Sequence, residues 1–138
     1  MAQQNVASAI KNPVKEGWLQ KQSRHLRKWR PRWVVLEGST LHTFKKEKDY
    51  ANPTEIIDLK VFSSVKSSED HTHKAFSFDV YSPESRFSFV AKSENEKEDW
   101  IRHIGKAIVL SNNKSVYQKE IEWNGGDDDD DEDEDEDE

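Results

Sequence analysis

A stretch of sixteen residues, from Trp18 to Trp33, combines positive charge with large aromatic rings. It holds six Lys or Arg side chains and three tryptophans. Arginine presents a planar fork of donors that matches two phosphate oxygens, and lysine presents a compact point charge. So many cations in one short segment indicate a candidate site for phosphate groups.

The net charge of the chain hides this basic character. The total is −7, but the last twelve residues, from Asp127 to Glu138, are all acidic. Residues 1–126 carry 21 basic and 16 acidic side chains, which leaves them at +5. A basic body predicts an anionic partner, which can be a phosphate, a nucleic acid or a membrane surface.

The reactive side chains argue against an enzyme. Cysteine is absent, and the chain has no glycine-rich phosphate loop, no G-x-S-x-G and no H-E-x-x-H motif. Carboxylates are paired mainly in the acidic tail, where no rigid scaffold would position them. His71-Thr72-His73 has the spacing of a metal-binding strand, but its polar surroundings, SSEDHTHK, favour a solvated loop. We therefore expect no catalysis, no metal site and no cofactor.

The apolar runs are too short to cross a bilayer. WVVL and AIVL are four residues long, whereas a spanning helix needs about 20. The N-terminal segment lacks the apolar core of a secretory signal. We expect a cytoplasmic protein of one domain that contacts membranes only peripherally.

Six segments rich in aromatic and β-branched residues predict strands. They read EGWLQKQ, RWVVLEG, TLHTFKKE, EIIDLKVFSSV, KAFSFDVY and RFSFVAK. In the last two segments, apolar residues alternate with polar ones, which is the period of a strand with one buried face. In KAFSFDVY the apolar residues are Phe76, Phe78 and Val80. SPES is expected to join these two strands, and Gly38-Ser39 to form a tight turn between the second and third segments.

The periodicity changes after Ser93 to that of an amphipathic helix. Its apolar stripe consists of Trp100, Ile101, Ile104, Ala107 and Ile108. Ser93 and Glu96 have the spacing of a capping box, so the helix should begin near Glu94 and end near Leu110. About seven strands followed by one helix predict a mainly β domain, a sheet pair or barrel closed at one end by the helix.

Three separated motifs in the right order carry a family resemblance. They are Gly17-Trp18-Leu19, then Arg32-Trp33, and finally Trp100 in the predicted helix. From about residue 15 to 109 the chain resembles a pleckstrin-homology (PH) domain, and it is most similar to small single-domain PH proteins of plants and some protists. The resemblance implies two near-orthogonal antiparallel sheets capped by the C-terminal helix.

The resemblance also implies a binding site. Many family members bind phosphoinositide headgroups through a first-strand Lys, a later basic-x-Arg triplet and two apolar residues. Lys21, Arg30-Pro31-Arg32 and Trp33-Val34 fit this pattern. Further cations expected at the same mouth of the barrel are Arg24, Arg27, Lys28 and Lys45 or Lys46. A solvated basic face is the alternative, but the spacing favours phosphate binding.

Two departures from the family pattern bear on specificity. Members that select highly phosphorylated headgroups tend to carry a tyrosine where Thr43 stands and a basic residue where Thr54 stands. Their absence favours a monophosphorylated or loosely discriminated headgroup. Leu26, at the expected loop tip, is a candidate for membrane contact, although single exposed leucines are common.

We divide the chain into four parts on these grounds. They are an N-terminal extension (1–14), the PH domain (15–110), an apolar extension expected to pack on it (111–124) and an acidic tail (125–138). The tail has no apolar surface and cannot fold alone. It is interpreted as a solubilising end, a binder of basic proteins such as histones, or a competitor for the basic mouth.

These observations together predict an adaptor that binds phosphoinositide headgroups in intracellular membranes, such as the endosomal or plasma membrane. The alternative is a protein-interaction module on the same fold, whose basic patch and acidic tail both serve protein partners. We expect a monomer and no nucleic-acid partner.

Overall fold

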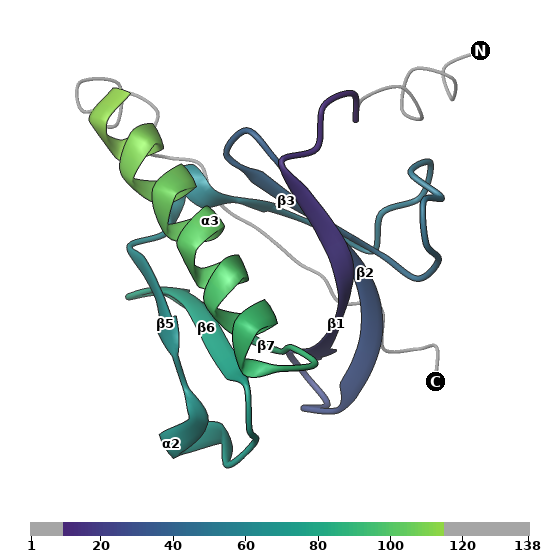
Figure 1. Cartoon of the computed structure of the whole chain (residues 1–138), viewed down its shortest axis with the longest axis vertical. Coiled ribbons are helices and arrows are strands. Elements are labelled where there is room, and N and C mark those ends of the chain that lie inside the picture. The colour runs from purple at the N-terminus through teal and green to yellow at the C-terminus, as the bar shows by residue number, and fades with distance from the viewer. Residues whose placement is uncertain (1–9, 115–138) are drawn as a thin grey trace.

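The computed structural model describes residues 10–114 as seven strands with a long C-terminal helix (Figure 1). The elements are β1 (Lys15–Gln22), β2 (Trp29–Glu37), β3 (Thr40–Phe44), β4 (Glu55–Asp58), η1 (Leu59–Val61), β5 (Ser64–Ser67), α2 (Glu69–Thr72), β6 (Ser77–Ser82), β7 (Ser85–Val90) and α3 (Glu94–Lys114). The acidic tail and most of the two extensions lie outside the described residues. Within residues 10–114, no helix is long and apolar enough to cross a bilayer.

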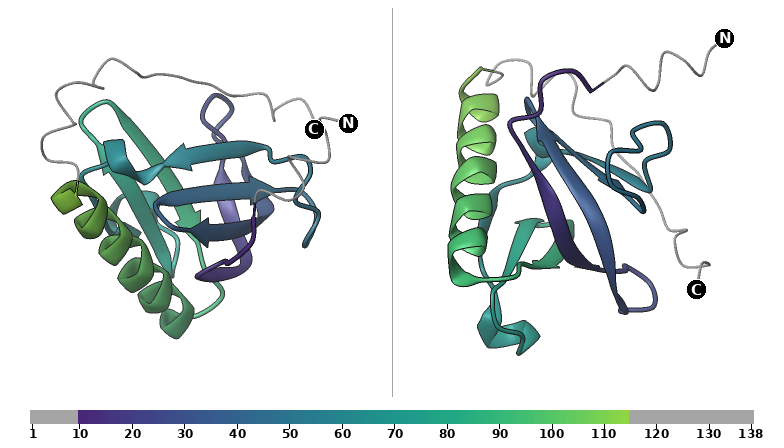
Figure 2. Two further views of the ribbon diagram at one scale, coloured as in Figure 1. Left: turned by 90° about the horizontal axis from the view of Figure 1, so that it is seen from above. Right: turned by 45° about the vertical axis from the view of Figure 1, so that its right-hand side comes forward.

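The strands form one continuous antiparallel sheet in the order β4-β3-β2-β1-β7-β6-β5. The two expected sheets are its two halves, β1–β4 and β5–β7, which cross one another in Figure 2. Within residues 10–114, the strand pairing that joins the two halves is that of Gln20 with Val90 and of Lys21 with Phe89. The predicted fold class, mainly β with one capping helix, is confirmed.

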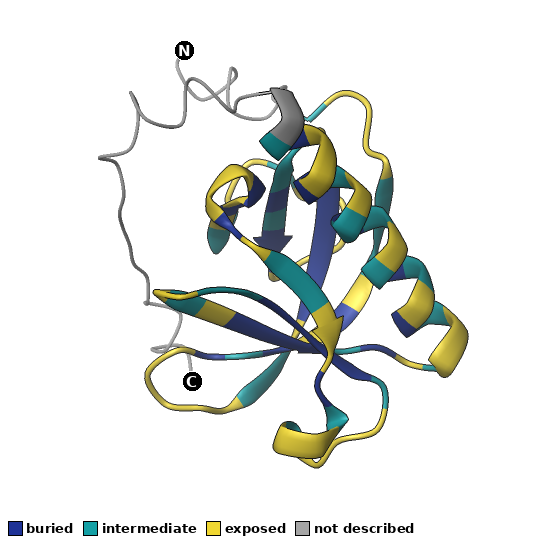
Figure 3. Cartoon of the chain, turned by 90° about the vertical axis from the view of Figure 1, so that its left-hand side faces the viewer, coloured by how far each residue is buried: buried dark blue, intermediate teal, exposed yellow. Residues whose placement is uncertain are grey.

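Helix α3 closes one side of this bent sheet with the predicted stripe. Trp100, Ile104 and Ile108 are buried and pack with the inner faces of both halves, and Figure 3 shows buried and exposed positions alternating along the helix. The Ser93 hydroxyl accepts a hydrogen bond from the Glu96 N–H at 3.2 Å, as the capping motif predicts. The helix continues to Lys114, past the expected end near Leu110, because Ser111 extends the buried stripe.

A second apolar cluster covers the outer face of β2 and β3. It consists of Trp33, Val35 and Phe44, with Ile10 and Tyr50 packed against them. The carboxylate of Glu16 accepts hydrogen bonds from the Trp33 indole at 3.2 Å and from the Tyr50 hydroxyl at 2.5 Å. Strand β2 is thus buried on both faces. This rigid strand carries two of the predicted site residues.

Two parts of the predicted layout are wrong. The segment EIIDLKVFSSV is not one strand, because the short helix η1 separates β4 from β5 and begins at the buried Leu59. The Asp58 side chain caps this helix by accepting a hydrogen bond from the Lys60 N–H at 3.0 Å. The polar loop SSEDHTHK contains the short helix α2, which the His71 ring anchors to the buried Asp79 carboxylate at 2.7 Å.

Candidate functional site

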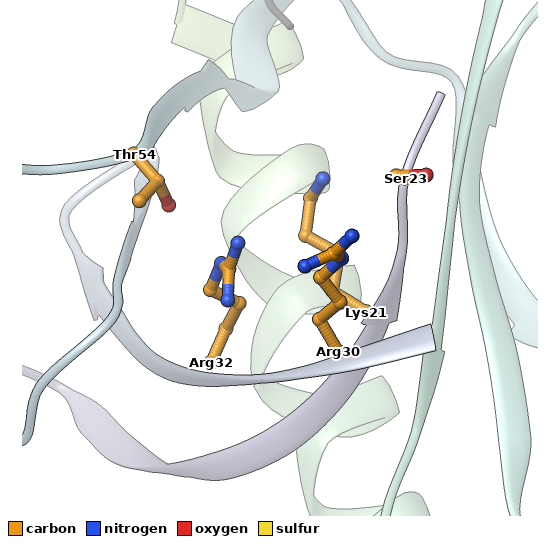
Figure 4. Close-up of a pocket in the computed structure, with 5 residues that line it drawn as sticks. All are labelled: Lys21, Ser23, Arg30, Arg32 and Thr54. Carbon is orange, nitrogen blue, oxygen red and sulfur yellow. The ribbon is translucent and has the colours of Figure 1, made fainter. Parts of the chain in front are cut away.

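Lys21, Arg30 and Arg32 line one small pocket at the loop end of the β1–β2 hairpin, together with Ser23 and Thr54 (Figure 4). The register of the hairpin sets Lys21 directly opposite Arg30. Because side chains alternate along a strand, Arg30 and Arg32 share one face of β2. Figure 4 shows all three basic side chains pointing into the same space.

The pocket continues the inner face that forms the core. Further along the same faces of β1 and β2, the inward residues are Leu19, Val34 and Leu36, all buried. Toward the loop that joins the two strands the inward positions become cationic, and Lys21 and Arg32 are only 5% and 7% exposed. Charges so deeply placed are costly unless anionic or hydrogen-bonding groups meet them. The arrangement is suited to an anion with several acceptor oxygens.

Lys21 is held by an internal carboxylate. Its ammonium lies 2.7 Å from Oε1 of Glu55, the first residue of β4, and 5.4 Å from the centre of the Phe87 ring. Glu55 was not predicted as a site residue, because the pattern that indicated the site consists only of cations. The signal was present, however: Glu55 stands two residues before the buried Ile57, so the period of a strand places both on the inner face.

Thr43 and Thr54, the two departures from the family pattern, are hydrogen-bonded to each other. Their hydroxyl oxygens are 2.7 Å apart, and the Thr54 hydroxyl also donates to the Thr43 carbonyl at 3.1 Å. Thr54, which lines the pocket, and Thr43 beside it are therefore short neutral side chains. The pocket has no long basic side chain at the two positions where the resemblance would place additional phosphate ligands.

The loop cations surround the mouth but do not line it. Arg24, Arg27 and Lys28 are exposed on the β1–β2 loop, and the Arg24 guanidinium lies 5.0 Å from the centre of the Phe87 ring. The loop is tightly closed, because the Ser23 N–H donates to the Lys28 carbonyl at 2.8 Å. Leu26 is 48% exposed in this loop.

Lys45 and Lys46 lie outside the pocket. Both are exposed and follow the last residue of β3, and neither lines the pocket. Among the described residues, no group of three or more His, Asp or Glu side chains is placed to hold a metal ion. The expected basic site thus divides into three lining residues and five surrounding ones.

A model of the PH domain family matches residues 13–109. The chain is 36% identical over 114 residues to Pleckstrin homology domain-containing protein 1 of Arabidopsis thaliana, with 80% of this chain and 78% of that protein covered. It is 32% identical over 122 residues to Rho GTPase-activating protein 24 of Homo sapiens, covering 80% of this chain but only 16% of that protein. The chain therefore belongs to the PH domain family.

Solved structures share the fold. The C-terminal PH domain of pleckstrin superposes with a TM-score of 0.60 at 23% identity, over 71% of this chain and 99% of that one. The same pleckstrin domain in complex with D-myo-Ins(1,2,3,4,5)P5 superposes with a TM-score of 0.55 at 24% identity, over 72% of this chain and 98% of that one. A solution structure of a pleckstrin homology domain superposes with a TM-score of 0.63 at 29% identity, over 72% of this chain and 88% of that one.

Proposed function

We propose that this chain is a membrane-targeting module that binds the phosphates of phosphoinositide headgroups through Lys21, Arg30 and Arg32. The observation that carries the proposal is their convergence from two adjacent strands into one pocket. A phosphate has enough acceptor oxygens to bind donors from both strands at once, and arginine can hold it with two parallel hydrogen bonds. Binding would place an anion beside cations that the fold already holds largely away from water.

The surroundings of the pocket are consistent with a membrane. The exposed Arg24, Arg27 and Lys28 lie on the loop that joins the two site strands, and each basic residue near an anionic bilayer is worth about 1 kcal/mol. Leu26, on the same loop, would enter the interface beside a bound headgroup. The domain would then approach an intracellular membrane, endosomal or plasma, with this loop foremost.

The family match and the solved structures also support a binding module. PH domains are generally non-catalytic modules that bind lipids or proteins, and a pleckstrin domain of this fold has been solved with an inositol pentakisphosphate. Both observations concern the family and its fold. The chemistry of this particular pocket comes from its own three cations.

The direct test is the variant Arg32→Ala on vesicles that each contain one phosphoinositide. We expect a loss of about 1.5–3 kcal/mol in headgroup affinity, because a charged hydrogen-bonding partner is removed. Sedimentation of the full chain with the vesicles measures it. Arg102→Ala, which removes the same charge from an exposed site on α3, serves as the matched control and should bind like the parent.

Two outcomes would overturn the proposal. One is that Arg32→Ala sediments with vesicles as well as the parent protein does. The other is that the parent binds no phosphoinositide in the panel. Either result would favour the protein-interaction function for the same basic surface.

A further inference from the structure

The Lys21–Glu55 ion pair places a negative charge directly against Lys21, a lining residue of the proposed headgroup site. The two side chains are 5% and 14% exposed, and their charged atoms are 2.7 Å apart. Glu55 is held in place by the sheet, because it pairs with Thr43 across β3 and β4. A ligand phosphate that approaches Lys21 therefore meets a carboxylate already bound to it.

The pocket is consequently polarised. Strands β1 and β2 supply Lys21, Arg30 and Arg32. On the opposite side Thr54, the residue before β4, lines the pocket, and the carboxylate of Glu55 in β4 contacts Lys21. With Glu55 included, the three cations carry a local charge of +2. A phosphate monoester carries about −1.5 to −2 at neutral pH. The phosphodiester that every phosphoinositide carries adds one further negative charge to each headgroup equally. The sum of these four side-chain charges therefore lies closer to a headgroup with one monoester phosphate than to one with two or three.

We infer that Glu55 is a specificity-determining residue, which favours headgroups with one monoester phosphate over more highly phosphorylated ones. The inference rests on the proposed function. If the carboxylate stays on Lys21, it repels the ligand, and this repulsion grows with each added phosphate. If it swings away, Lys21 exchanges one anion for another, and much of the gain from ligand binding is lost.

The test compares the parent chain with Glu55→Gln, which keeps the shape of the side chain and removes its charge. The probes are water-soluble dibutanoyl phosphoinositides with one or three monoester phosphates, titrated calorimetrically against the full chain. For charges a few ångströms apart near a protein surface, we expect affinity to rise about threefold for the first probe and about tenfold or more for the second. Glu84→Gln, in the exposed β6–β7 turn, makes the same charge change away from the pocket and should alter neither affinity.

Glu55→Asp guards against a variant that fails to fold. Its carboxylate is one methylene shorter and retreats from the ligand, so the affinity for the highly phosphorylated probe should lie between those of the parent and Glu55→Gln. Two results would overturn the role of Glu55 and leave the proposed function intact. One is an equal gain in affinity for both probes, and the other is no gain in affinity in either variant while the parent still binds. If no form of the protein binds either probe, both the proposed function and this inference fail.

Discussion

Among the residues that the structure describes, Trp100 is the largest side chain that is completely buried. The Lys15 ammonium lies 5.0 Å from the centre of the Trp100 ring. A Cβ atom added to Gly17 would lie 3.9 Å from the Cζ2 atom of the same ring. The indole N–H finds no acceptor within the part of the chain that the structure describes. The residue therefore stabilises the fold through its packed volume and not through a hydrogen bond.

We predict that Trp100→Ala lowers the free energy of unfolding by about 3–5 kcal/mol, because it leaves a large cavity between α3 and the sheet. Trp100→Phe should cost much less, since it keeps an aromatic ring and also removes a buried donor that has no acceptor. Chemical denaturation of both variants measures the difference. Equal losses in the two variants, or an unchanged stability in Trp100→Ala, would contradict this account of the helix contact.

Lys97 connects three elements near the start of α3. Its ammonium, in a side chain only 4% exposed, lies 3.1 Å from the Ser67 hydroxyl of β5, 3.2 Å from Glu69 of α2 and 3.3 Å from Glu94 of α3. Burial lowers the pKa of Lys97, but the hydrogen bonds to Glu69 and Glu94 outweigh it and leave the pKa raised. This contact fixes α2 against the helix.

Glu69 also holds the chain where it enters β6. Its carboxylate accepts a hydrogen bond from the Phe76 N–H at 2.7 Å, and Phe76 has a left-handed backbone with φ of 63°. The alternation of Phe76 with Phe78 was predicted as part of a strand, but the strand begins only at Ser77. The turn at Phe76 thus depends on a carboxylate seven residues earlier.

We predict an acid-sensitive stability from this contact. The Phe76 N–H, and next Lys97, lower the pKa of Glu69 below its ordinary value of 4.5. A carboxyl with a lowered pKa stabilises the folded state above its ordinary pKa, and this stabilisation is lost as the pH falls through the folded value. The melting temperature of the parent should therefore fall more steeply below pH 4.5 than that of Glu69→Gln.

Circular dichroism melts from pH 7 to pH 3 measure these slopes. Asp70→Asn removes the neighbouring exposed carboxylate and is the matched control, which should keep the slope of the parent. Parallel curves for the parent and Glu69→Gln would show that the contact does not contribute to stability.

The acidic tail lies outside the described residues, but the length of the chain lets it reach the basic pocket. Helix α3, with 21 residues, is about 31 Å long at ~1.5 Å per residue. It starts shortly after β7, which pairs with Lys21, so its far end is about that distance from the pocket. Residues 115–126 span up to about 40 Å when extended, which brings residues 127–138 within range.

We predict that deleting residues 127–138 raises vesicle affinity strongly at low salt and only slightly at physiological salt. A tethered anion competes at an effective concentration that can reach millimolar. Screening weakens this exposed contact as the Debye length falls from ~30 Å at 0.01 M salt to ~8 Å at 0.15 M. Vesicle sedimentation at both salt concentrations measures the effect.

A soluble inositol phosphate separates this competition from simple repulsion between the tail and a membrane. Competition for the pocket would weaken binding of the small ligand too, whereas repulsion from a bilayer surface would leave it nearly unchanged. Equal affinities for the soluble ligand with and without the tail, at low salt, would leave the tail as a solubilising end or a binder of basic proteins.

The sequence alone determined the features that depend on residues close together in the chain. The alternation around Phe87 and Phe89 and the stripe containing Trp100 are local, because strand and helix periods repeat within a few residues. The meeting of Lys21 with Arg30 could also be predicted, since a short hairpin loop brings the end of its first strand next to the start of its second. The family resemblance drew on these same local motifs.

Only the tertiary structure decided which groups surround those cations. Glu55 is 34 positions from Lys21, and their contact depends on β4 pairing with β3 and on the sheet bending until the two side chains meet. The continuation of α3 through Ser111 likewise depends on what the rest of the chain offers it to pack against. Periodicity shows which face of an element is buried, but the charge balance of a pocket is set where distant elements meet.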